Sequence, residues 1–156
     1  MIDLRAHERP LQSFLATALD QFTRKEPELT FGQVSLYCCP WAGWVSLCIN
    51  ETPQPAQNCP DFDYVEVALY DAPEWSDEYQ NEPLIRIIAS DGECLELDLE
   101  AFGDEVMNAV FFDFLRGLLS QPATLRTLRE AAGGELRVGV QLLDSEFNEA
   151  WTISRP

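Results

Sequence analysis

Basic residues are scarce in this chain. Its 156 residues include 27 acidic residues but only ten Lys and Arg together, and the net charge at pH 7 is −17. Lysine occurs once, as Lys25, and Arg86 is the one basic residue between Lys25 and Arg116. A surface with this charge repels nucleic acid and anionic lipid and attracts cationic partners. We therefore expect neither direct nucleic-acid binding nor membrane binding.

Long apolar runs are also missing. No stretch approaches the roughly 20 apolar residues that a membrane-spanning helix needs. The N-terminal segment carries early charges of both signs and no apolar core, which is not typical of a secretory signal. We expect a cytoplasmic protein whose five cysteines stay reduced. A hydrophobic fraction of 46% argues against global disorder, and the length favours a single domain spanning 1–156.

Motifs for catalysis and metal binding are absent as well. The five cysteines show no C-x-x-C spacing, so we expect no zinc site. The single histidine, His7, is the expected base for any cysteine nucleophile, and whether it meets Cys39 in space is left open. No Gly-rich phosphate loop and no G-x-S-x-G sequence occurs. We therefore expect no metal and no cofactor, and we assign no catalytic residue.

The helices are predicted by apolar periodicity. Apolar residues recur every three or four positions over 10–24, which places them on one stripe of an amphipathic helix. Pro10 suits the first turn of that helix, and Pro27 lies just past its end. Two more helices are predicted over 104–119 and 122–132, the second ending at a Gly-Gly pair.

The strands are predicted by alternation of apolar and polar residues. They cover 33–49 as a hairpin, 62–70, 135–143 and 148–153. In the second of these segments, alternation places Val65, Val67 and Leu69 on one face. The proline-containing stretches before and after it are predicted to be loops, over 50–60 and 71–83.

Residues 84–99 predict two strands joined by a short turn at Ser90-Asp91-Gly92. A two-residue turn would set Ile87 opposite Glu96. A three-residue turn with Gly92 in the left-handed conformation sets Arg86 opposite Glu96 instead. The second register pairs opposite charges and sets apolar residues opposite apolar ones, so it is the register that we predict.

This register places three alternate acids, Glu96, Asp98 and Glu100, on the outer face. Strand geometry would space them by roughly 6.6–6.8 Å, which suits a mimic of a nucleic-acid backbone. Together the elements predict an α+β fold with a mainly antiparallel sheet of about five to seven strands. An N-terminal helix and the two helices after the central strands would pack on that sheet.

The acidic residues are concentrated in the segment 61–105, which holds 15 of them against the single basic residue Arg86. Within it, Trp75 and Tyr79 lie among carboxylates. Aromatic anchors with charged rims are typical of binding hot spots and can receive an Arg- or Lys-rich surface. The competing interpretation is that Trp75 anchors its loop to the core. The candidate partner-binding residues are Asp71, Glu74, Trp75, Asp77, Glu78, Tyr79, Glu82, Glu96, Asp98 and Glu100.

These features predict a non-enzymatic acidic binding protein that docks a basic protein partner. Small size, acidity and the lack of cofactor motifs fit a bacterial toxin-neutralising protein of the immunity type. The alternatives are a small enzyme or ligand-binding protein with a carboxylate-lined pocket, and a nucleic-acid mimic. A cleft with close carboxylates would favour the pocket. The oligomeric state is not predicted.

Overall fold

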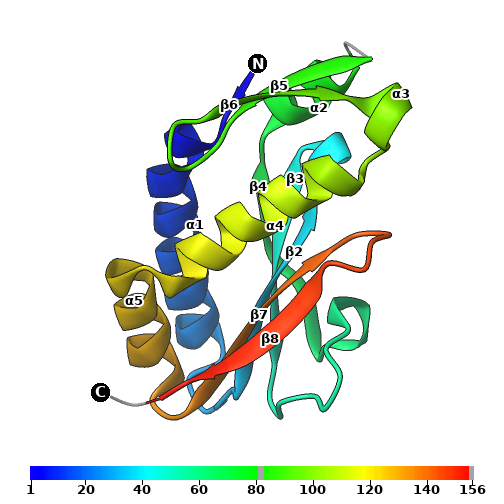
Figure 1. The fold of residues 1–156 in the computed structure, drawn as a ribbon. Helices are drawn as coiled ribbons and strands as arrows, with labels where there is room; N and C mark the ends of the chain where they lie inside the picture. Colours follow the sequence, from blue (N-terminus) through cyan, green and yellow to red (C-terminus); the bar gives the residue numbers. More distant parts are fainter. Residues whose placement is uncertain (81–82, 155–156) are drawn as a thin grey trace.

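The computed structural model describes residues 1–80 and 83–154. Helices pack on two separate sheets, so the predicted α+β class is confirmed (Figure 1). The larger sheet has five strands in the order β4-β3-β2-β7-β8, and the smaller has three in the order β1-β5-β6. One cluster of buried apolar side chains includes residues from both sheets and from the long helices. The predicted sheet is therefore divided into two sheets that share a core.

The larger sheet is built around the predicted hairpin of β2 (Gln33–Cys39) and β3 (Trp44–Asn50). β4 (Tyr64–Asp71) pairs antiparallel with β3 and forms one edge. On the other side, β7 (Leu136–Leu142) runs parallel to β2, and β8 (Asn148–Ile153) pairs antiparallel with β7. A parallel pair needs a long crossover connection, which the chain between β4 and β7 supplies.

Three helices cover one face of this sheet: α1 (Leu4–Lys25), α4 (Glu105–Ser120) and α5 (Pro122–Ala132) (Figure 1). The helix after the central strands, α4, buries Phe111 and Leu115 in the shared core. The predictions for α4 and α5 are confirmed because apolar spacing and end signals agreed there. No helix in the described part of the chain has both the length and the apolarity to cross a bilayer.

α1 begins at Leu4, well before the predicted start at Pro10. Asp3 caps the helix because its carboxylate accepts a hydrogen bond from the Arg5 backbone N at 3.1 Å. Pro10 therefore lies inside the helix, and its predicted place in the first turn is wrong. Its ring is exposed, as is Ala6, so water can hydrate the Ala6 carbonyl that loses its usual donor.

A β-bulge interrupts β4. Glu66 has φ 54°, and the pairing of β4 with β3 shifts register there. Val65 and Leu69 are exposed, whereas Val67 packs against the core. The predicted common face is wrong for Val67, because this residue lies within the irregular segment, where the regular pairing with β3 is interrupted and strict alternation does not hold.

The segment 51–63 packs on the outer face of the larger sheet. At its centre the buried Gln57 carboxamide accepts a hydrogen bond from Ser35 Oγ and donates one to Asn148 Oδ1 at 2.9 Å. Gly139 of β7 lies directly beneath, where any Cβ would collide with this carboxamide. The stretch is a loop, as predicted, and most of it is exposed, but its buried residues Gln57, Cys59 and Phe62 fix it to the sheet.

The smaller sheet consists of β1 (Ile2–Asp3), β5 (Leu84–Ile88) and β6 (Cys94–Asp98). β1 runs parallel to β5, and β6 pairs antiparallel with β5. Arg86 lies opposite Glu96, and Gly92 in the turn has φ 89°. The predicted three-residue turn and its register are therefore confirmed.

Two short helices lie next to the smaller sheet, α2 (Pro73–Tyr79) and α3 (Leu99–Phe102). α2 replaces the predicted loop. α3 ends the strand early because the Asp98 carboxylate accepts hydrogen bonds from the backbone N atoms of Glu100 and Ala101, at 3.0 and 3.1 Å. The predicted row of strand carboxylates is therefore wrong at its end: Glu100 lies on a helix, and Asp98 is its cap.

Candidate functional site

The predicted aromatic anchor Trp75 lies in the core. α2 turns its indole inward, and the side chain is 0% exposed. The ring packs edge-on against Phe111 with centroids 4.7 Å apart. Its Nε1–H donates to His7 Nε2 at 3.0 Å. The expectation that Trp75 contacts a partner is wrong for this fold, because none of the indole is accessible.

His7 links Trp75 to Tyr70. Its Nε2 accepts from the indole, so we assign the ring proton to Nδ1, which donates to Tyr70 Oη at 2.7 Å. Glu74 Oε1 also lies 3.0 Å from Nε2, but this carboxylate is exposed, so solvent screens its charge. Burial lowers the pKa of His7, although the carboxylates of Glu74 and Asp3 oppose the shift. The imidazole is therefore neutral at pH 7 and serves as a structural hydrogen-bond link.

Cys39 is buried, and burial raises the pKa of its thiol to about 11. A reactive cysteine needs the opposite shift. Across residues 1–80 and 83–154, the hydrogen bonds of His7 go to Tyr70 and Trp75, and none joins it to Cys39. The two residues therefore do not form a nucleophile and base pair.

Glu78 is also used inside the molecule. Its buried carboxylate accepts hydrogen bonds from the Met1 ammonium group and from the backbone N of Arg86, the latter at 3.1 Å. Burial by itself raises the pKa of Glu78, but these donors outweigh it and the pKa is lowered. The carboxylate is thus charged and ties α2 to the N-terminus and to β5, so it is not presented to a partner.

The other predicted partner-binding residues are mostly exposed. Asp98 is half-buried as the cap of α3, and half-buried Tyr79 donates its hydroxyl to Asp104 Oδ1 at 2.9 Å. Glu82 lies outside the described residues. Five remain as accessible carboxylates: Asp71, Glu74, Asp77, Glu96 and Glu100. They belong to the end of the molecule that holds the smaller sheet, whereas the acids at 61–66 lie at the opposite end of β4 (Figure 1).

A groove of about 480 Å³ lies between the N-terminus of α4 and the turn that joins β7 to β8. We call it the acidic groove. Four of its lining residues are acidic, two on each wall, and none is basic. The lining residues are Asp104, Glu105, Asn108, Asp144, Ser145, Glu146 and Phe147. A cation between the two walls is attracted by both pairs of carboxylates.

The turn wall of the acidic groove is held by its own hydrogen bonds. Ser145 Oγ donates to the Leu142 carbonyl at 3.1 Å and accepts from the Phe147 backbone N at 3.2 Å. The Phe147 ring packs against Phe112 of α4 with centroids 5.6 Å apart. On the helix wall, the positive end of the α4 dipole favours the carboxylates of the first turn. Both walls are therefore in place without a ligand.

Asn108 gives the acidic groove an unused polar group. The side chain is only 8% exposed and lines the groove. Its backbone N donates to the Asp104 carbonyl at 2.8 Å, but its carboxamide makes no hydrogen bond within the described part of the chain. The nitrogen and oxygen atoms of this carboxamide keep some contact with solvent, so a water molecule or a ligand in the groove can supply the missing hydrogen bond.

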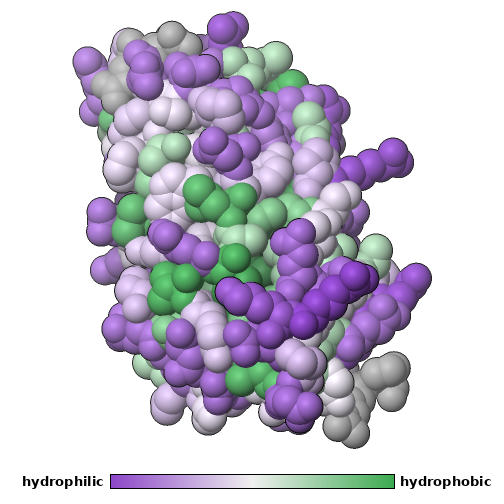
Figure 2. All heavy atoms as spheres, turned by 180° about the vertical axis from the view of Figure 1, so that it is seen from behind, coloured by the Kyte–Doolittle hydropathy of each residue, from purple (hydrophilic) through white to green (hydrophobic). Residues whose placement is uncertain are grey.

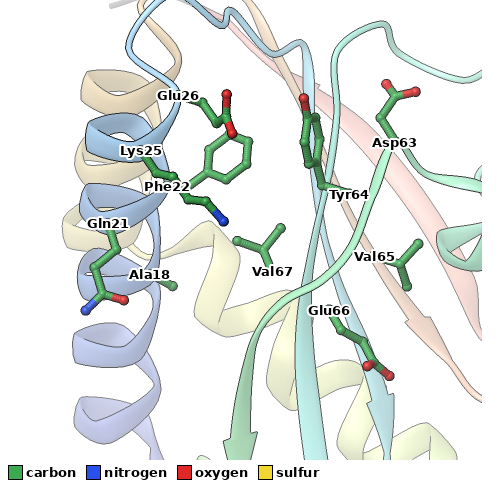
Figure 3. Close-up of a pocket in the computed structure, with 10 residues that line it drawn as sticks. All are labelled: Ala18, Gln21, Phe22, Lys25, Glu26, Asp63, Tyr64, Val65, Glu66 and Val67. Carbon is green, nitrogen blue, oxygen red and sulfur yellow. The ribbon is translucent and has the colours of Figure 1, made fainter.

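A second groove, of about 440 Å³, lies between α1 and β4 (Figure 3). Lys25 extends into it, close to the apolar side chain of Val67. Glu26, Asp63 and Glu66 also line it, so one cation and several carboxylates share the same space. The view from behind shows exposed hydrophobic atoms interspersed with hydrophilic ones (Figure 2). This mixed lining is less selective for a cation than the acidic groove.

The acids do not converge on a metal site. In residues 1–80 and 83–154, no group of three or more His, Cys, Asp or Glu side chains is placed to hold a metal ion. The carboxylates of the acidic groove are spread along two walls, an arrangement that suits an extended cation with several donors better than a single ion.

The sequence interpretation missed the turn wall of the acidic groove. Asp144, Glu146 and Phe147 lie about 40 residues from Asp104, and only the fold brings the two segments together. A weak signal existed, since an acidic-aromatic cluster lies between two predicted strands. Such clusters are common in turns, so the signal by itself indicates no site.

No protein-family model matches the chain, and no match is found among curated proteins or solved structures. The functional argument therefore depends on the geometry and charge of the acidic groove and its surroundings.

Proposed function

We propose that this protein is a non-enzymatic binding protein that docks a basic protein partner on an acidic surface. The observation that carries the proposal is the acidic groove, with four carboxylates on two facing walls and no basic lining residue. The surrounding charge has the same sign. Of the 14 acids of segment 61–105 that the structure describes, 12 are exposed, and Arg86 is the one basic residue of the segment.

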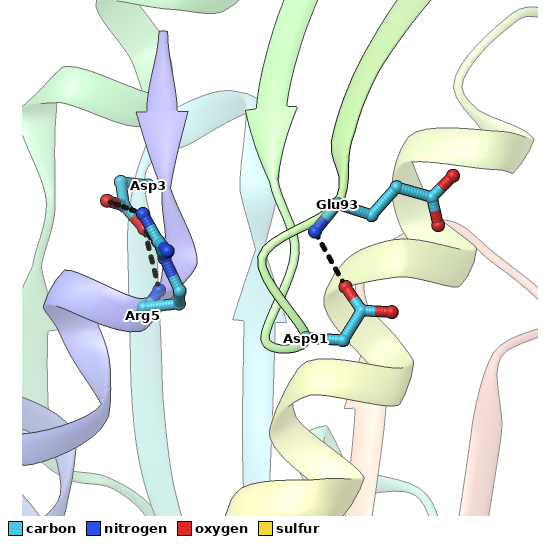
Figure 4. Close-up of polar contacts among 4 residues, drawn as sticks. All are labelled: Asp3, Arg5, Asp91 and Glu93. Atoms are coloured by element: carbon cyan, nitrogen blue, oxygen red, sulfur yellow. Dashed lines mark hydrogen bonds and ion pairs between the residues drawn. The ribbon is translucent and has the colours of Figure 1, made fainter.

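The carboxylates of the acidic groove have no ion-pair partner in the described part of the chain. The surface ion pairs lie elsewhere and join Arg5 to Asp3, Arg24 to Asp20 and Arg116 to Glu149. At the β5–β6 turn, the Arg5 guanidinium group is hydrogen-bonded to Asp3, and the Asp91 carboxylate accepts from the Glu93 backbone N (Figure 4). Uncompensated carboxylates accelerate encounter with a basic partner in a salt-sensitive way.

Phe102 supplies an exposed aromatic next to the acidic groove. It ends α3, is 62% exposed, and precedes the groove residue Asp104 by one glycine. Aromatic side chains at the centre of an interface contribute much of its binding energy. We therefore assign to Phe102 the anchoring role that buried Trp75 does not fill. The docking surface consists of the acidic groove, Phe102 and Glu100.

A toxin-neutralising protein of the immunity type is the biological class that best fits this proposal. Size, strong acidity and a cation-seeking surface support it. The ligand-binding alternative also gains one supporting observation, because a groove of about 480 Å³ lined by carboxylates is the feature it requires. The exposed Phe102 favours the protein partner, since a small ligand in the groove leaves that ring unused.

Affinity capture tests the proposal. The chain is immobilised through its C-terminus, and proteins of the native cell are captured at about 0.05 M and about 0.5 M salt, where the Debye length falls several-fold. We expect a basic protein to be retained at low salt only. The pure pair is then reconstituted, and its affinity is expected to fall at least about tenfold at high salt. A salt-indifferent pair, or no basic partner, contradicts the proposal.

Phe102→Ala sharpens this test. It should weaken the reconstituted pair by about tenfold or more, as hot-spot aromatics do. Val65→Ala is the control, because Val65 is an exposed apolar residue that lines the second groove, on the edge strand β4 at the opposite side of the sheet from β8. Equal effects of the two substitutions place the interface elsewhere and contradict the assignment of the docking surface.

A further inference from the structure

We infer that the acidic groove receives the guanidinium group of one arginine side chain from the basic partner. The inference rests on the proposed function and adds the chemistry of the central contact. Three observations carry it: the two acidic walls, the unpartnered Asn108 carboxamide, and the Phe147 ring in the lining.

The carboxylates on the two walls suit a cation that has several hydrogen-bond donors. Asp104 and Glu105 lie on the helix wall, and Asp144 and Glu146 on the turn wall. Tyr79 already donates to Asp104 Oδ1, which fixes that carboxylate and leaves its second oxygen for a ligand. A guanidinium group has five N–H donors in one plane, so it can bond to both walls at once.

Asn108 distinguishes this groove from an ordinary acidic surface. Its carboxamide lines the groove, has no hydrogen-bond partner among the described residues, and offers an acceptor oxygen to a ligand. Exposed carboxylates are hydrated at little cost, whereas a carboxamide that is 8% exposed gains from a bound donor. A fifth N–H of the same guanidinium group is suited to this position.

Phe147 favours arginine over lysine. The ring lines the groove and is held against Phe112. A guanidinium plane stacks on an aromatic face, whereas an ammonium group is compact and strongly hydrated. The exposed Phe102 beside the groove then contacts the partner's surface around that arginine. The acidic groove thus favours an arginine side chain, and the Phe102 ring outside the groove favours an arginine that belongs to a protein.

The inference is tested by NMR titration of the ¹⁵N-labelled protein with N-acetyl-arginine methylamide. The lysine and glycine methylamides and calcium chloride serve as comparison probes. We expect saturable shifts at 104–108 and 144–147 with the arginine probe, with a Kd of about 1 mM or weaker, as befits one side chain. The lysine probe should bind at least about threefold more weakly. Equal binding of both probes, or preferential binding of calcium, overturns the inference.

Variants locate the site. Glu105→Gln with Asp144→Asn should weaken the arginine probe about tenfold, and Asn108→Ala should reduce its preference over the lysine probe. Asp91→Asn with Glu93→Gln is the matched control, with the same charge change on a turn outside the groove, and should change binding less than about twofold. Spectra with native dispersion show that each variant is folded. An effect of the control equal to that of the groove pair overturns the inference.

The two proposals fail separately. In the reconstituted pair, one Arg→Lys substitution of the partner should weaken binding about tenfold and show coupling with Asn108→Ala in a double-mutant cycle. A salt-sensitive pair that tolerates every such substitution overturns the arginine inference and leaves the proposed function intact. Binding of the arginine probe at micromolar Kd with no basic partner overturns the proposed function and assigns the groove to a small guanidinium ligand.

Discussion

Helix α2 and the acidic groove contain similar side chains and use them in opposite ways. In α2, Trp75 is fully buried and the Glu78 carboxylate is bonded to the N-terminal ammonium group. In the acidic groove, four carboxylates and the Asn108 carboxamide face a space that no basic residue lines. The comparison shows that acidity and aromatic content alone do not distinguish an internal role from an accessible surface, because the fold decides which of these side chains keep a face toward solvent.

Of the substitutions considered, Trp75→Ala should lower the free energy of unfolding most. A small loss would contradict the contrast between a buried α2 and an accessible groove. Removing a fully buried indole leaves a cavity, and such substitutions lower the free energy of unfolding by about 3–5 kcal/mol. Urea denaturation followed by circular dichroism measures it. Phe102→Ala is the control, with an expected change within about 0.5 kcal/mol because the ring is 62% exposed. Similar losses for the two variants would mean that Phe102 is a packing residue.

Glu78→Gln and Glu105→Gln sharpen the same comparison for carboxylates. Glu78→Gln weakens two hydrogen bonds to a buried carboxylate and should lower the free energy of unfolding by roughly 1–3 kcal/mol. Glu105→Gln removes one of several like charges in the acidic groove but also a carboxylate that the α4 dipole favours, so the free energy of unfolding should change by less than about 1 kcal/mol. Denaturant titrations at low salt compare the two. A loss for Glu105→Gln as large as that for Glu78→Gln would show that the groove is already neutralised internally.

The smallest expected effect is the dependence of the free energy of unfolding on pH through His7. Burial lowers the pKa of His7 in the folded state, so the unfolded chain binds more protons as the pH falls through about 6.5, the ordinary value. The free energy of unfolding should therefore decrease between about pH 7 and pH 5. In His7→Gln this decrease should largely disappear, whereas Glu105→Gln should retain it. Thermal unfolding across this range measures the slope, and equal slopes in the wild type and His7→Gln would contradict the assignment of a neutral imidazole.

Much of the fold could be predicted because local signals agreed with one another. The β5–β6 register follows from one glycine and from matching apolar and charged residues across the turn. The α4 and α5 boundaries follow from apolar spacing with Pro122 and a glycine pair as end signals. The hairpin of β2 and β3 could be predicted equally well, because apolar and polar residues alternate without interruption along each strand.

The remaining features depend on contacts between distant segments. Pro10 lies inside α1 because Asp3 caps the helix and Leu4 is held in the core. The orientation of Trp75 is decided by His7, 68 residues earlier, which supplies the acceptor for its indole. The acidic groove likewise joins an α4 wall to a turn near the C-terminus. Apolar periodicity within a short stretch of sequence cannot predict contacts between segments that lie far apart in the chain.

The Gln57 carboxamide, seated over Gly139, has a practical consequence for handling this molecule. A stretch with three prolines and no strand is where an engineer would ordinarily insert an epitope, attach a fluorophore or open the chain for permutation. Here the Gln57 carboxamide of that stretch fills the space above Gly139, a strand residue that has no side chain. Changes to the stretch would therefore disturb the sheet. Labels are better placed at Gly117, an exposed position of α4 with open space around it and an ordinary helical backbone.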